Sequence, residues 1–228
     1  MDVNTILLPI ILPLLAVALG VVIALIFKPA VTNAVKLLLS FSGAFLLAIT
    51  IFEFLPEVYA QGGKEIGVYI ILGLLMQILL EFGSKGAEHG HVHQEAKRSF
   101  PLLLFVSLSL HAFVEGFPVA GNTSLLYGVV IHKIPIAIIL SSFLLRAEMP
   151  RGYIALFLIG FALMTPLGAF AKAYVEPLQT YNTYVDAFAV GILLHVATTI
   201  LFESSKNHQF NASKFISILV GIGLAYLL

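Results

Sequence analysis

Long apolar runs, separated by short clusters of charged residues, Gly, Pro and Asn, fill the chain from end to end. A helix needs about 20 apolar residues to cross the hydrocarbon core of a membrane. Backbone groups in hydrocarbon must be paired, so such runs form helices that pack into one bundle. The pattern predicts eight membrane-spanning helices: Thr5–Phe27, Ala34–Pro56, Ile66–Phe82, Phe100–Pro118, Leu125–Leu145, Ile154–Tyr174, Val185–Phe202 and Phe215–Leu228. The sequence therefore predicts an all-α integral membrane protein, with residues 1–228 as a single transmembrane domain.

The composition agrees with this prediction. Of 228 residues, 60% are apolar and only 11% are Asp, Glu, Lys or Arg, which excludes an ordinary water-soluble globule. Twelve basic and twelve acidic residues give no net charge, which argues against a nucleic-acid partner. The chain has no Cys, so disulfides and thiolate-rich metal sites are excluded. This composition favours a protein that is surrounded by the lipid bilayer.

Basic residues are concentrated in alternate loops, which predicts the orientation in the membrane. Two basic residues, Lys64 and Lys172, lie in the loops after even-numbered spans. Nine follow odd-numbered spans: Lys28, Lys36, Lys85, Lys97, Arg98, Arg146, Arg151, Lys206 and Lys214. Because cytoplasmic loops carry the excess of Lys and Arg, the odd loops are expected in the cytoplasm and both termini outside. The expected location is the cell membrane, inner or plasma.

Ionisable residues inside the spans are the strongest functional signal, because each is costly at membrane depth without a partner. His111 and Glu115 are four residues apart in the fourth span and therefore share one helix face. His132 and Lys133 lie in the fifth span, and His195 lies in the seventh. At about 1.5 Å per residue, His111 and His132 both lie roughly 10 Å below the outer edge, and His195 roughly 15 Å below it.

Two imidazoles and a carboxylate at one depth supply three ligands for a divalent cation. His111, Glu115 and His132 would leave a coordination position open for water or for an exchanging ligand, whereas a permanent structural site would be closed by a fourth protein ligand. The alternative is structural: His111 and Glu115 bond each other or a nearby Ser and lock the bundle.

These residues stand in motifs that resemble the ZIP (Zrt/Irt-like) family of divalent metal transporters. His111-Ala112-Phe113-Val114-Glu115-Gly116 is similar to the family's fourth span, and His132-Lys133-Ile134-Pro135-Ile136 to its fifth. Phe54-Leu55-Pro56-Glu57 and Pro166-Leu167-Gly168 resemble its second and sixth spans. The resemblance implies a ZIP-like bundle that forms a homodimer. A weak similarity between residues 43–48 and 191–197 fits inverted three-helix repeats around helices 4 and 5.

Three positions depart from the family pattern. Many members hold two metals side by side, and Ala112, Lys133 and Ile136 replace ligands of the second metal. We therefore expect one central site. Lys133 has two interpretations: its ammonium replaces the missing second cation and organises Glu115, or it pairs with another carboxylate and only holds the bundle.

Other polar residues suggest a path for the ion. His195 fits a relay position below the central site, although a structural histidine is the alternative. Glu53 and Glu57 either attract cations to the entrance or mark the end of a helix. The short cytoplasmic loop 83–99 is expected either to capture metal weakly through His89, His91 and His93 or to be an ordinary solvated loop.

The sequence thus predicts a secondary transporter that carries a divalent transition metal toward the cytoplasm. The ligand set favours Zn2+ as the transported ion, and Fe2+, Mn2+, Co2+ and Cd2+ are compatible. No enzyme activity and no catalytic cofactor are expected. The alternatives are an intramembrane zinc-dependent hydrolase and a metal sensor that binds without transporting.

Overall fold

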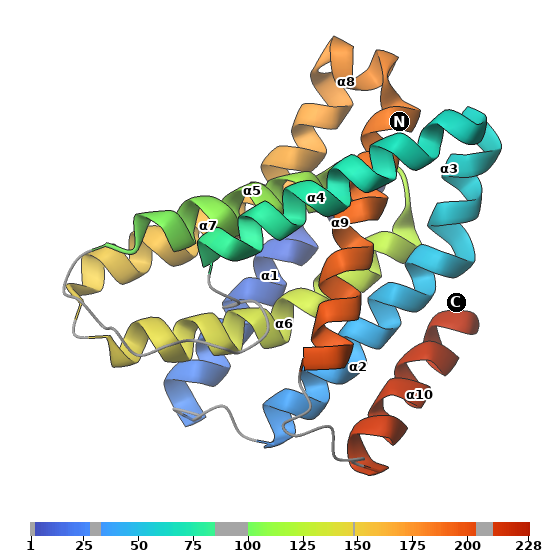
Figure 1. The fold of residues 1–228 in the computed structure, drawn as a ribbon. Helices are drawn as coiled ribbons and strands as arrows, with labels where there is room; N and C mark the ends of the chain where they lie inside the picture. The colour runs from blue at the N-terminus through green and yellow to red at the C-terminus, as the bar shows by residue number, and fades with distance from the viewer. Residues whose placement is uncertain (1–2, 28–32, 85–99, 148, 204–211) are drawn as a thin grey trace.

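The computed structural model describes residues 3–27, 33–84, 100–147, 149–203 and 212–228, and these residues form helices joined by short turns, with no strand among them. The long helices lie in a bundle whose successive members reverse direction (Figure 1). In chain order the elements are α1 Val3–Phe27, α2 Asn33–Ile49, the π-helix η1 Thr50–Phe54, α3 Leu55–Gly62, the 3-10 helix η2 Gly63–Glu65, α4 Ile66–Ser84, α5 Leu102–Val119, α6 Thr123–Arg146, α7 Arg151–Tyr174, α8 Glu176–Thr180, α9 Asn182–Glu203 and α10 Ala212–Tyr226. The predicted all-α class is confirmed.

Six helical stretches of the described chain are long and apolar enough to cross a membrane. One of them, residues 33–83, runs through both the second and the third predicted spans, and α10 is apolar but shorter. Large apolar side chains also point away from the bundle; Leu79 is 68% exposed and Leu156 is 60% exposed. An outer surface of this kind is stable against lipid, which supports an integral membrane protein.

Two elements differ from the prediction. The second span was expected to end at Pro56, but the chain stays helical through η1 and α3 to Gly62. Pro56 lies directly after the π-helical turn η1, in which the backbone N–H of Leu55 bonds the carbonyl oxygen of Thr50. A local π turn of this kind lets a membrane helix continue through a proline. Helix α8 was not predicted, because a helix of five residues is too short to show a helical period in the sequence.

Glycines set the closest helix contacts. Helix α5 packs along α7, and α4 packs along α9. A β-carbon at Gly168 of α7 would overlap the carbonyl oxygen of Phe113 in α5, and one at Gly191 of α9 would overlap the carbonyl oxygen of Ile70 in α4. Small residues at such crossings let the backbones approach each other in a membrane. The close α5–α7 contact fixes the helix that carries His111 and Glu115.

Candidate metal centre

His111 and Glu115 on α5 and His132 on α6 converge inside the bundle. Their side chains are 5%, 1% and 2% exposed. Each offers a ligand atom, and these atoms all lie within 4.8 Å of one another. In the part of the chain that the structure describes, this is the one group of three or more His, Cys, Asp or Glu residues that could hold a metal ion.

The α5–α6 hairpin explains why the three side chains meet. A short turn joins the two helices, and the side chain of Asn122 caps α6 by accepting a hydrogen bond from the backbone N–H of Leu125 at 2.9 Å. His111 and His132 stand at nearly equal distances along the chain from this turn. Antiparallel helices therefore place the two imidazoles at one level, and Glu115 follows one turn after His111.

Gln77 supports the site from α4. Its side chain is fully buried, and its Oε1 lies 3.1 Å from Nδ1 of His111. An amide oxygen only accepts, so with Oε1 toward the ring this contact suits the tautomer that carries its proton on Nδ1 and keeps the lone pair on Nε2. A hydrogen-bond partner on the ring nitrogen that does not bind the metal orients the imidazole and fixes its tautomer. Gln77 was not predicted from the sequence, because an apolar helix gives no signal of which neighbour a lone Gln faces.

Lys133 pairs with Glu115. Its Nζ lies 2.8 Å from Oε2 of Glu115, both side chains are buried, and the same ammonium stands 5.0 Å from the ring centroid of Phe161. The other carboxylate oxygen of Glu115, Oε1, is buried and has no hydrogen-bond partner among the described residues. The ammonium of Lys133 thus neutralises the carboxylate at Oε2, and Oε1 is available to a metal ion.

His195 does not join this group. Its Nε2 lies 2.6 Å from Oε2 of Glu81 on α4, and the hydroxyl of Thr199 lies 3.5 Å from the same nitrogen. Glu81 was not singled out from the sequence, because it stands near the end of an apolar run where an acidic residue is ordinary. Its orientation toward α9 is a property of the packed bundle.

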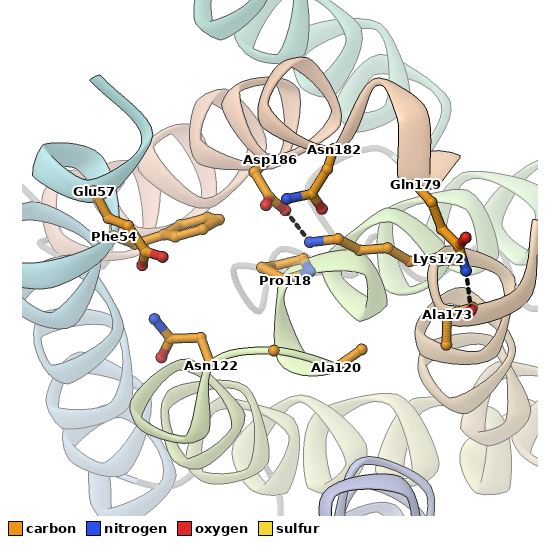
Figure 2. A pocket seen from close by; sticks show the side chains of 11 residues that line it. Phe54, Glu57, Pro118, Ala120, Asn122, Lys172, Ala173, Gln179, Asn182 and Asp186 are labelled. Carbon is orange, nitrogen blue, oxygen red and sulfur yellow. Dashed lines mark hydrogen bonds and ion pairs between the residues drawn. The ribbon is translucent and has the colours of Figure 1, made fainter. Parts of the chain in front are cut away.

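A cavity of about 430 Å³ opens beyond the central group, between the C-terminal ends of α5 and α7, the starts of α6 and α9, and the residues of η1 and α3 that face them. Glu57, Asn122 and Asp186 surround the same space, and Lys172 bonds Asp186 along one side of it (Figure 2). The predicted entrance residue Glu57 lines this cavity, whereas Glu53 is not among its lining residues. Pro118, one turn after Glu115 on α5, also lines it. The cavity therefore reaches the turn of α5 next to the candidate ligands.

The predicted cytoplasmic capture tract lies outside the described residues. Helix α4 extends to Ser84, and His89, His91 and His93 fall in the part of loop 83–99 that follows. Their role in metal capture stays a prediction.

A family model described as ZIP zinc transporter matches residues 83–228. The chain belongs to the ZIP family. The resemblance in the motifs of the fourth and fifth predicted spans is thereby confirmed, and all three candidate ligands lie in the matched part.

Curated relatives of this ZIP family member carry the names of zinc transporters. The chain is 28% identical over 134 residues to zinc transporter ZIP1 of Danio rerio, covering 55% of this chain and 44% of the relative. It is 30% identical over 152 residues to zinc transporter ZIP9-B of Xenopus laevis, covering 58% of this chain and 50% of the relative. The chain thus spans about half the length of the curated relatives it matches.

Proposed function

We propose that this ZIP family member is a secondary transporter of a divalent transition metal, Zn2+ above all, through one central site. The observation that carries the proposal is the convergence of His111, Glu115 and His132, three buried side chains whose ligand atoms lie within 4.8 Å. Imidazole nitrogen with carboxylate oxygen suits Zn2+, and it also accepts Fe2+, Mn2+, Co2+ and Cd2+. The names of the relatives favour zinc.

The charges around Glu115 suit an ion that must leave again. Before metal arrives, the ammonium of Lys133 neutralises the carboxylate through Oε2, while Oε1 stays available. An incoming dication then shares Glu115 with a fixed positive charge a few ångströms away. Repulsion between the two cations weakens binding, since charges interact strongly where water is excluded. Lys133 thus acts as a surrogate for a second cation and favours release.

The path of the ion follows from the cavity and from the basic loops. The excess of Lys and Arg after odd-numbered spans favours a cytoplasmic position for those loops. The cavity beside Glu57 then faces outside and serves as the entrance, with Pro118 between it and Glu115. From the central site the ion moves toward the cytoplasm past His195 and reaches the tract of His89, His91 and His93.

We extend the proposal to the architecture of the whole protein. Eight spans, with inverted three-helix repeats around the helices that bear the central site, place both termini outside the cell membrane. The assembly is a homodimer. These statements rest on the apolar runs, the distribution of basic residues and the family.

Family membership favours transport over the two alternatives. A hydrolase would need a second carboxylate as general base beside the metal. Glu115 is the carboxylate of the described central group, and it is paired with Lys133. A sensor would bind metal without moving it, so a binding titration combined with a flux assay separates it from a carrier.

Zinc uptake into proteoliposomes tests the proposed function. His111→Ala and Glu115→Gln each remove one ligand, so uptake should fall at least about tenfold, as expected when more than about 1.4 kcal/mol of binding is lost. Glu65→Gln, a change of an exposed carboxylate on η2, is the matched control and should transport normally. Undiminished uptake by correctly folded His111 and Glu115 variants would remove the central site.

A further inference from the structure

We propose a second cation site, formed by Glu81 of α4 and His195 of α9 with the hydroxyl of Thr199, as the next station after the central site. The proposal rests on the proposed transport function. The sequence predicted His195 alone as a relay position, and the second site adds Glu81 and Thr199 as ligands. The carboxylate and the imidazole already face each other, with Oε2 and Nε2 2.6 Å apart.

The register of α4 places the two sites in sequence. Gln77 and Glu81 are four residues apart and therefore share one face of α4, about 6 Å apart along its axis. Gln77 contacts the ligand His111, and Glu81 contacts His195. One helix face thus carries a polar contact to the central site and, one turn later, a polar contact to the second site. The later turn lies nearer the end of α4 that the basic loops favour as cytoplasmic.

The chemistry of this pair suits a weak and transient site. Nitrogen from His195 and oxygen from Glu81 are ligands of the same types as those of the central group. Among the described residues the site offers two strong ligands, His195 and Glu81, so water can complete the coordination shell. His195 and Glu81 are 17% and 20% exposed, which gives water access that the central side chains lack. Few ligands and bound water predict lower affinity and faster release.

Thr199 and Thr198 provide a matched comparison. Both hydroxyls bond backbone carbonyl groups within α9, the Thr199 hydroxyl at 2.8 Å from the carbonyl oxygen of His195. Of the two hydroxyls, that of Thr199 also lies 3.5 Å from Nε2 of His195. Replacing each Thr by Val therefore makes the same chemical change one residue apart, with an effect expected at Thr199 alone.

Titration of the full-length protein with Co2+, followed by the visible absorption of the bound ion, tests the second site. We expect one tight and one weaker binding step. Glu81→Gln and His195→Gln should remove the weaker step and keep the tight one, and Thr199→Val should weaken it several-fold while Thr198→Val does not. In proteoliposomes the two Gln variants should lower the maximal rate at least fivefold, with little change in the metal concentration that gives half of it.

His111→Ala separates this inference from the proposed function. It should remove the tight step and leave the weaker one. Absence of both steps in the unaltered protein would overturn the proposed function together with the inference. A single tight step in the unaltered protein, or a weaker step that survives in Glu81→Gln, would overturn the second site alone. Glu81→Gln has the shape of the native side chain and still bonds His195, so its folding does not limit the test.

Discussion

In the proposed mechanism, the ammonium of Lys133 should determine how tightly the central site holds its ion. Lys133→Met removes the ammonium next to Glu115, so an incoming dication meets an unshared carboxylate. We expect the Kd for Zn2+ to fall about tenfold or more and turnover in proteoliposomes to slow because release becomes limiting. The metal-free variant should also melt at a lower temperature, since it buries an unpaired charge, and Zn2+ should restore its stability.

Lys64→Met, at an exposed position of η2, is the control for the Lys133 change and should leave Kd and melting temperature unaltered. An unchanged or weaker zinc affinity in Lys133→Met would show that the ammonium does not compete with the metal.

Gln77 should control affinity without touching the ion. Gln77→Leu removes the acceptor that fixes the tautomer of His111, and we expect zinc affinity to fall about 10- to 100-fold. Gln77→Glu keeps an acceptor at that position and should preserve binding. Gln61→Leu is the matched control for zinc affinity, because Gln61 is exposed on α3 and bonds Glu57 and Thr183, outside the central group. Equal affinities in Gln77→Leu and the unaltered protein, measured by competition with a chelator, would contradict this role.

Two relations could be predicted: which residues share a face of one helix, and which residues lie at the same level on two consecutive antiparallel helices. Contacts between helices that are not consecutive could not. His111 and Glu115 share a face because of their spacing, and His132 reaches the same level because the two helices form a hairpin. Gln77 and Glu81 escaped attention because their significance depends on how α4 turns toward α5 and α9, and the ion pair of Lys172 with Asp186 depends on how α7 meets α9. Apolar runs do not encode these rotations.

At the scale of helices, the glycine contact between α5 and α7 holds the site in place. Gly168→Ala would place a β-carbon against the carbonyl oxygen of Phe113, so α7 must move away from α5. We expect a loss of about 1–3 kcal/mol in stability, seen as a lower melting temperature, together with reduced uptake. Gly152→Ala, in the first turn of the same helix with open space around it, should be tolerated. Similar melting temperatures for both variants would refute the close-packing argument.

Helix positions were predictable because the length and the apolar content of a run of residues indicate a membrane helix. Each predicted span coincides with a helix, to within a few residues at most ends. The exceptions have local causes: η1 and α3 continue past Pro56, and α8 is too short to be recognised. The number of helices that cross the membrane remains a prediction, because the helical stretch of residues 33–83 holds both the second and the third predicted spans, which the turn at Gly63 separates.

For the whole molecule, the absence of Cys makes the proposed orientation directly testable. Single cysteines introduced as Lys64→Cys and Lys206→Cys lie in loops that are predicted to face opposite sides of the membrane. A membrane-impermeant maleimide should label the first in intact cells and the second only after permeabilisation. Labelling in the reverse order would invert the proposed direction of transport.

X-ray absorption at the zinc edge, on the full-length protein loaded with one equivalent of Zn2+, tests the central claim most directly. The spectrum of the unaltered protein should show two imidazole ligands and oxygen donors, and His111→Ala should lose one imidazole while Glu65→Gln changes nothing. A spectrum without imidazole scattering, or one that His111→Ala leaves unaltered, would contradict the claim that these three buried side chains hold the transported ion.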